Sequence, residues 1–88
     1  MAYKICIPAE GNIETGVIIK WHVQAGDIVE AGDPLCDVET DKTSFLVESF
    51  CDATILGIIR SEGEEVPVLE MIGFMGEPGE TIDDVIGE

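Results

Sequence analysis

The chain has 88 residues, 45% of them hydrophobic, and a net charge of −15 from 19 acidic and 4 basic side chains. This length allows one domain with one small core, and the acidic balance argues against nucleic acid or an anionic membrane as a partner. No run has the length of a membrane span or the pattern of a secretion signal, and three scattered cysteines with one histidine predict neither disulfides nor a metal site, so we expect a cytoplasmic protein.

Short apolar runs separated by glycine, aspartate, asparagine and proline predict an all-β domain, because helical periodicity is weak throughout. In chain order, the predicted strands are Tyr3–Pro8, Gly16–Val23, Ile28–Val29, Leu35–Thr40, Thr43–Glu48, Thr54–Ile59, Glu65–Val66 and Met71–Met75. The composition then changes to glycine, proline and acid. We therefore expect the domain to cover residues 1–76, and residues 77–88 to form an acidic tail or the start of an interdomain linker.

The two halves of the chain resemble each other at an offset of 37 residues. The matching positions are Ile18-Ile19 with Ile55-Leu56, Gly26-Asp27 with Gly63-Glu64, Val29 with Val66, Asp33 with Glu70, and Leu35 with Ile72. Two halves that are each too small to bury an apolar face would pack on one another with approximate two-fold symmetry. Chance similarity among apolar residues and glycines is the alternative.

Lys42 lies between two predicted strands and is the only Lys or Arg between Lys20 and Arg60. Neither residue of the expected Asp41-Lys42 turn is glycine, so a primed hairpin turn is not predicted. Thr40 and Thr43 would pair across it, and the Asp41 carboxylate could accept local backbone N–H groups. Such a turn would present the amine at a fixed position to a modifying enzyme. An ordinary solvated lysine is the alternative.

The order and spacing of several motifs resemble those of the lipoyl domains of 2-oxo-acid dehydrogenase complexes, from about Tyr3 to Met75. The residues that carry this resemblance are Gly16, Trp21, Gly26-Asp27, Gly32-Asp33, Glu39-Thr40-Asp41-Lys42 and Glu62-Gly63-Glu64-Glu65-Val66-Pro67-Val68. The resemblance implies a flattened barrel-sandwich of two small antiparallel sheets with quasi-two-fold symmetry. It places the lysine hairpin at one end and the termini at the other.

The resemblance also implies a function. In that family the lysine equivalent to Lys42 carries lipoic acid in amide linkage, attached by a lipoate ligase or a lipoyl transferase. The arm shuttles acyl groups and electrons between a thiamine-diphosphate 2-oxo-acid decarboxylase, an acyltransferase core and dihydrolipoyl dehydrogenase. The chain alone is then a carrier without catalytic residues, and its parent protein a dihydrolipoyl acyltransferase.

Two other functions stay open at this point: a biotinyl carrier domain of a carboxylase, and an unmodified all-β docking module. Biotin carriers place their lysine between methionines, whereas Asp41 and Thr43 flank Lys42 here, which favours lipoate. The family often has glycine where this chain has Ala53 and Leu69, and a positive φ at either position would cost stability.

Recognition of the lysine is expected to involve Glu39, Thr40, Asp41, Thr43 and Leu46, with the loop Ala9–Thr15 beside them. Strand alternation after Lys42 puts Leu46 and Phe50 on the face opposite to Val47. If Val47 points into the core, Leu46 and Phe50 are exposed and could contact a partner. A bulge near Ser49 that turns Phe50 inward is the alternative.

Overall fold

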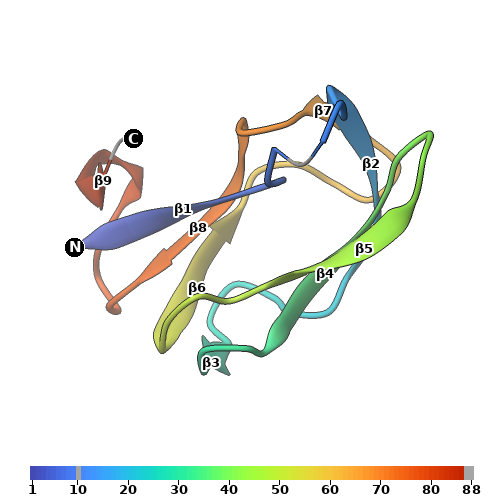
Figure 1. Cartoon of the computed structure of the whole chain (residues 1–88). Coiled ribbons are helices and arrows are strands. Elements are labelled where there is room, and N and C mark those ends of the chain that lie inside the picture. The colour runs from blue at the N-terminus through green and yellow to red at the C-terminus, as the bar shows by residue number, and fades with distance from the viewer. Residues whose placement is uncertain (10, 87–88) are drawn as a thin grey trace.

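Two small β-sheets face each other across an apolar core (Figure 1). The computed structural model describes residues 1–9 and 11–86. Its elements are β1 (Ala2–Cys6), β2 (Thr15–Trp21), β3 (Ile28–Val29), β4 (Pro34–Glu39), β5 (Ser44–Glu48), β6 (Ala53–Ile58), β7 (Glu65–Pro67), β8 (Met71–Gly76), the 3-10 turn η1 (Ile82–Asp84) and β9 (Val85–Ile86). All eight predicted strands are confirmed, with ends that differ by no more than two residues.

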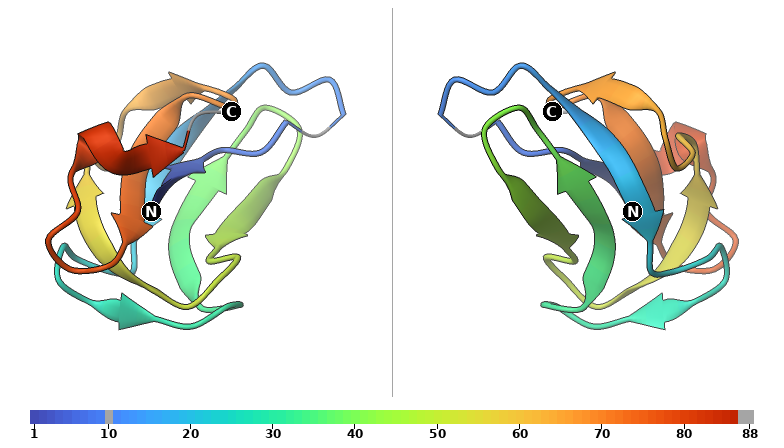
Figure 2. Two further views of the ribbon diagram at one scale, coloured as in Figure 1. Left: turned by 90° about the vertical axis from the view of Figure 1, so that its left-hand side faces the viewer. Right: turned by 90° about the vertical axis from the view of Figure 1, so that its right-hand side faces the viewer.

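The strand order is β5-β4-β2-β7 in one sheet and β3-β6-β8-β1-β9 in the other. All pairings are antiparallel except that of β9 with β1. The predicted sandwich is therefore confirmed, and the two views in Figure 2 show its two layers. No helix in residues 1–9 and 11–86 has the length and hydropathy of a membrane span.

The two halves of the chain clamp each other by equivalent backbone hydrogen bonds. The N–H of Gly26 donates to the carbonyl of Ile55 (2.7 Å), and the N–H of Ile55 donates to the carbonyl of Asp27 (2.8 Å). At the positions 37 residues away, the N–H of Gly63 donates to the carbonyl of Ile18 (2.6 Å), and the N–H of Ile18 donates to the carbonyl of Glu64 (3.0 Å). The repeat is thus structural, because the turn of each half is hydrogen-bonded to a strand of the other half: Gly26-Asp27 to β6, and Gly63-Glu64 to β2.

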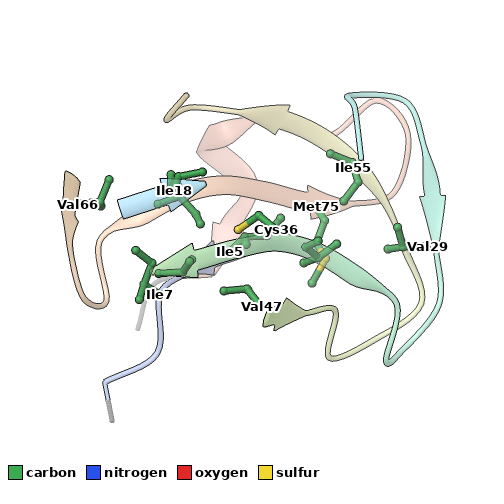
Figure 3. Packing of buried hydrophobic residues seen from close by; sticks show 12 residues of the cluster. Ile5, Ile7, Ile18, Val29, Cys36, Val47, Ile55, Val66 and Met75 are labelled. Atoms are coloured by element: carbon green, nitrogen blue, oxygen red, sulfur yellow. The ribbon is translucent and has the colours of Figure 1, made fainter. Parts of the chain in front are cut away.

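The core is filled from both halves (Figure 3). The first half contributes Ile18 and Val38, the second half contributes Ile55, Ile72 and Met75, and all five side chains are inaccessible to solvent. At about 25 cal/mol per Å² of apolar surface, burying each such side chain stabilises the fold by roughly 1.5–3 kcal/mol. This shared core is what holds the two sheets at a fixed distance beneath the hairpin between β4 and β5.

The faces of β5 follow the predicted alternation. Val47 and Ser49 are buried, whereas Leu46 is 40% and Phe50 61% exposed. The ring of Phe50 lies edge-on to Tyr3, with centroids 5.6 Å apart. The alternative of a bulge that turns Phe50 inward is therefore wrong.

The end of the described chain returns to β1. Thr81 caps η1 in a capping box with Asp84, and β9 pairs in parallel with β1 through Ala2↔Val85 and Tyr3↔Ile86. We expected an acidic tail or the start of a linker over residues 77–88. The strand β9 within this range was not predicted, because two residues are too short to give a periodic pattern. Residues 87 and 88 lie outside the described residues, and the boundary of the domain stays a prediction.

Candidate functional site

Lys42 lies at the tip of the β4–β5 hairpin, at the end of the molecule away from the N-terminus and β9 (Figure 1). Glu39↔Ser44 is the last pair of the ladder, and the N–H of Thr40 donates to the carbonyl of Thr43 (2.7 Å) to close the turn. Asp41 and Lys42 are both exposed. The amine therefore extends from a closed, hydrogen-bonded turn, as the sequence predicted.

The side chain that shapes this turn is Thr40. Its hydroxyl accepts the N–H groups of Lys42 (3.2 Å) and Thr43 (3.1 Å) and donates to the carbonyl of Thr43 (2.8 Å). We expected the Asp41 carboxylate to accept these N–H groups, and that expectation is wrong: in the described part of the chain it forms no hydrogen bond. A threonine that opens a turn can form such bonds, so the sequence contained the clue.

Gly16 brings β2 close to β4 beneath the hairpin. A Cβ at this position would lie 2.6 Å from Cγ1 of Val38, well inside contact distance, and 3.6 Å from the Cγ2 methyl of Thr40. Thr40 is half-buried, unlike the four exposed residues that follow it. The base of the hairpin thus packs on the core, while its tip is in solvent.

A groove of about 500 Å³ lies beside the lysine. Its lining includes four acidic residues and one basic residue: Glu14, Glu39, Asp41, Glu65 and Lys42. The predicted loop Ala9–Thr15 contributes Asn12, Glu14 and Thr15 to this lining, while residue 10 of the loop lies outside the described residues. The groove is therefore strongly acidic, and it would attract a basic partner surface.

The predicted recognition residues fall into two groups. Glu39, Thr40 and Asp41 line the groove with Lys42, and Thr43 is exposed next to them. Leu46 lies farther along β5 and lines a separate apolar groove with Pro8 and Phe50. A partner that contacts both groups would have to cover the edge strand β5 as well as the tip.

The site has the chemistry of an attachment point. Lys42 is exposed, and within residues 1–9 and 11–86 its ammonium forms no ion pair. Amide linkage of a carboxylic acid cofactor requires only such an amine and space around it. In the same residues no cluster of His, Cys, Asp and Glu is arranged to hold a metal ion.

Residues 3–75 match a family model described as "Biotin-requiring enzyme". The chain is 37% identical over 83 residues to the dihydrolipoyllysine-residue succinyltransferase component of the 2-oxoglutarate dehydrogenase complex of Rickettsia bellii (strain RML369-C), covering 93% of this chain and 20% of that protein. It is also 37% identical over 81 residues to the dihydrolipoyllysine-residue acetyltransferase component of the pyruvate dehydrogenase complex of Acholeplasma laidlawii, covering 92% of this chain and 15% of that protein. The chain thus spans about a fifth of the length of the curated relatives that it matches, or less.

A solved structure agrees with these sequence matches. The solution structure of the lipoyl domain of the 2-oxoglutarate dehydrogenase complex from Azotobacter vinelandii is similar with a TM-score of 0.66 and 32% sequence identity. The similarity covers 85% of this chain and 99% of that chain. The shared unit is therefore the complete compared domain.

Proposed function

This chain belongs to the biotin–lipoyl attachment family, and we propose that it is a lipoyl carrier whose cofactor is attached at Lys42. Membership supports a covalently attached cofactor of the lipoate or biotin type. The observation that carries the choice of residue is the exposed position of Lys42 at the tip of the closed hairpin between β4 and β5. The residues on either side of it, Asp41 and Thr43, support lipoate over biotin, because carriers of biotin have methionines at these two positions.

Lys42 would form the linkage through Nζ, which loses its positive charge when it becomes an amide nitrogen. The net charge of the chain would then change from −15 to −16. Lipoate, when bound, accepts an acyl group together with two electrons and later gives up both. Lys42 is exposed at the tip of the hairpin, so several partners could reach the same arm.

The domain contributes position and recognition to this chemistry, because the cofactor supplies the reactive atoms. A tethered arm replaces diffusion between partners with a high effective concentration. The acidic groove beside Lys42 would favour partners with basic surfaces and raise their rate of association. These partners would be a lipoate ligase or lipoyl transferase, a thiamine-diphosphate 2-oxo-acid decarboxylase, an acyltransferase core and dihydrolipoyl dehydrogenase.

The relatives are all named for a dihydrolipoyllysine residue, and they differ in the complex that their names give. What the similarity transfers to this chain is thus the carrier role. We assign the acyltransferase activity to the remainder of a longer parent protein, because the chain corresponds to about a fifth of such relatives or less.

Intact-mass spectrometry tests this function. The protein is treated with a lipoate-attaching enzyme and lipoate, and in parallel with a biotin ligase and biotin. We expect one lipoyl adduct and no biotinyl adduct. Lys42→Arg keeps the charge but removes the primary amine, and it should remain unmodified. A biotinyl adduct, a lipoyl adduct on Lys42→Arg, or no adduct when a reference lipoyl domain is modified in the same mixture would contradict the proposal.

A further inference from the structure

The turn that presents Lys42 lacks the usual residues for a two-residue hairpin loop. Such loops favour positive φ at their centre, because that conformation matches the twist of the strands. Among the described residues the only non-glycine with positive φ is Leu69, so Asp41 and Lys42 both have negative φ. A turn of this kind needs an additional interaction to define its shape.

Thr40 provides that interaction. Its hydroxyl accepts the N–H of Lys42 (3.2 Å) and the N–H of Thr43 (3.1 Å), and it donates to the carbonyl of Thr43 (2.8 Å). It is the one side-chain group in the described part of the chain that bonds the backbone of Lys42. The hydroxyl therefore fixes the peptide plane from which the lysine side chain extends.

The core in turn limits how the hydroxyl can rotate. The Cγ2 methyl of Thr40 lies above Gly16, where a Cβ would be 3.6 Å away, and the same Cβ would be 3.4 Å from Cδ1 of Ile7. A β-branched residue has few χ1 rotamers. The methyl of Thr40 therefore lies on the side of β2, and its hydroxyl lies on the side of the turn, where it forms the three hydrogen bonds.

We infer that Thr40 is the positioning residue for cofactor attachment, and that its hydroxyl holds the backbone of Lys42 in the conformation that the attaching enzyme recognises. This inference rests on the proposed function, since it concerns the same lysine. It assigns the role to a neutral residue two positions before Lys42. Asp41 is adjacent to the lysine in sequence, but its carboxylate forms no hydrogen bond within the described residues.

Three variants separate the hydroxyl from the methyl and from the loss of any threonine hydroxyl. Thr40→Val keeps the shape and removes all three hydrogen bonds, whereas Thr40→Ser keeps the hydroxyl. Thr54→Val is the matched control, because Thr54 is a half-buried threonine in β6 of the other sheet, away from the hairpin. The measurements are the kcat/KM of lipoate attachment and the hydrogen-exchange rates of the Lys42 and Thr43 amides in the unmodified protein.

We expect Thr40→Val to lower kcat/KM about tenfold and to speed exchange at both amides, since these donors lose their acceptor. Thr40→Ser and Thr54→Val should stay within about threefold of the original protein in both measurements. Retention of the melting transition shows that each variant is folded.

The outcomes distinguish this inference from the proposed function. Absence of a lipoyl adduct on the unaltered protein overturns the proposed function and the inference with it. An adduct that forms equally fast on Thr40→Val, or that slows by the same factor in Thr54→Val, overturns the inference alone. If Thr40→Ser is as slow as Thr40→Val while its amides remain protected, the hydroxyl is not the determinant and the inference is wrong.

Discussion

Leu69 occupies in the second half of the chain the place that Gly32 occupies in the first. The two positions are 37 residues apart, and both have positive φ, 70° for Leu69 and 93° for Gly32. The N–H of Gly32 donates to the carbonyl of Ser49 (2.8 Å), and that of Leu69 donates to the carbonyl of Ile7 (2.8 Å). The first half therefore has glycine, which adopts positive φ without strain, at this position. The second half has leucine in the same left-handed conformation, which lowers the stability of the fold by roughly 1–2 kcal/mol.

Leu69→Gly should therefore stabilise the fold. The side chain is 53% exposed, so the substitution removes less apolar burial than it would at a core position. Glycine removes the strain of the left-handed conformation, and this gain exceeds the loss of stability that comes from the larger conformational entropy of glycine in the unfolded chain. We expect the free energy of unfolding to increase by about 0.5–1 kcal/mol. Urea denaturation measures it. Leu46→Gly is the matched control, because Leu46 is 40% exposed in a strand with ordinary φ, and it should destabilise. Loss of stability in both variants would contradict the argument.

The sequence was sufficient to predict β1 to β8, because turn residues and alternating apolar residues are local features. The alternation after Lys42 also placed Leu46 and Phe50 correctly outside the core. Of the two positions where the resemblance expects glycine, Leu69 has positive φ, whereas Ala53 opens β6 with ordinary φ. Whether a residue needs glycine depends on backbone angles that its own neighbours in sequence do not specify.

The details of the site depend on contacts between distant segments, and they could not be predicted in the same way. The acceptor in the turn is the Thr40 hydroxyl rather than the Asp41 carboxylate, because the methyl of Thr40 packs over Gly16. That packing depends on the register of β2 against β4. Likewise, β9 was missed because pairing with β1, and not periodicity, makes two residues a strand.

Moving the lysine by one residue should separate position from stability. The double variant Asp41→Lys, Lys42→Asp keeps composition and net charge, and both side chains are exposed. We expect an unchanged melting temperature and a loss in lipoate attachment on the order of a hundredfold, because the amine leaves its place relative to the turn. A mass-spectrometric time course measures the loss. Equal rates would mean that the attaching enzyme recognises composition rather than geometry.

Leu46→Ser tests the surface along β5. Leu46 is 40% exposed opposite Asp37 in the ladder, so we expect the free energy of unfolding to change by less than about 1 kcal/mol and lipoate attachment to continue. Reductive acylation by the decarboxylase should slow by about fivefold if Leu46 contacts that enzyme. The control Ile28→Ser removes a residue that is 82% exposed in the other sheet, and it should leave the rate unchanged. An unchanged rate in Leu46→Ser would remove this residue from the docking surface.

Cys36 should make the fold sensitive to alkaline pH. Burial, assisted by the charge of Asp37, raises the pKa of this thiol from 9.0 to about 12. Because the folded-state pKa is raised, its contribution to stability is complete below pH 9 and is lost as the pH rises toward 12. Cys36→Ala lowers stability through a cavity but removes this dependence. The gap in unfolding free energy between the two proteins should therefore narrow from pH 9 to pH 11.

Urea titrations at several pH values measure this gap. The Cys51 thiol, whose pKa is also raised by burial, is present in both proteins and cancels in the comparison. A gap that stays constant over this range would contradict the assignment to Cys36.

The reciprocal hydrogen bonds between the two halves also determine when the domain can fold during synthesis. A nascent chain that ends near Lys42 has β2 without its partner β7 and β3 without its partner β6, so neither sheet can close. Such non-local pairing is slow to form and waits for the rest of the domain to leave the ribosome. The lysine turn, whose Thr40 lies close to Gly16 of β2, would acquire its shape only on a finished domain. Under the proposed function, attachment at Lys42 would then select for folded copies, because a misfolded copy would lack the turn.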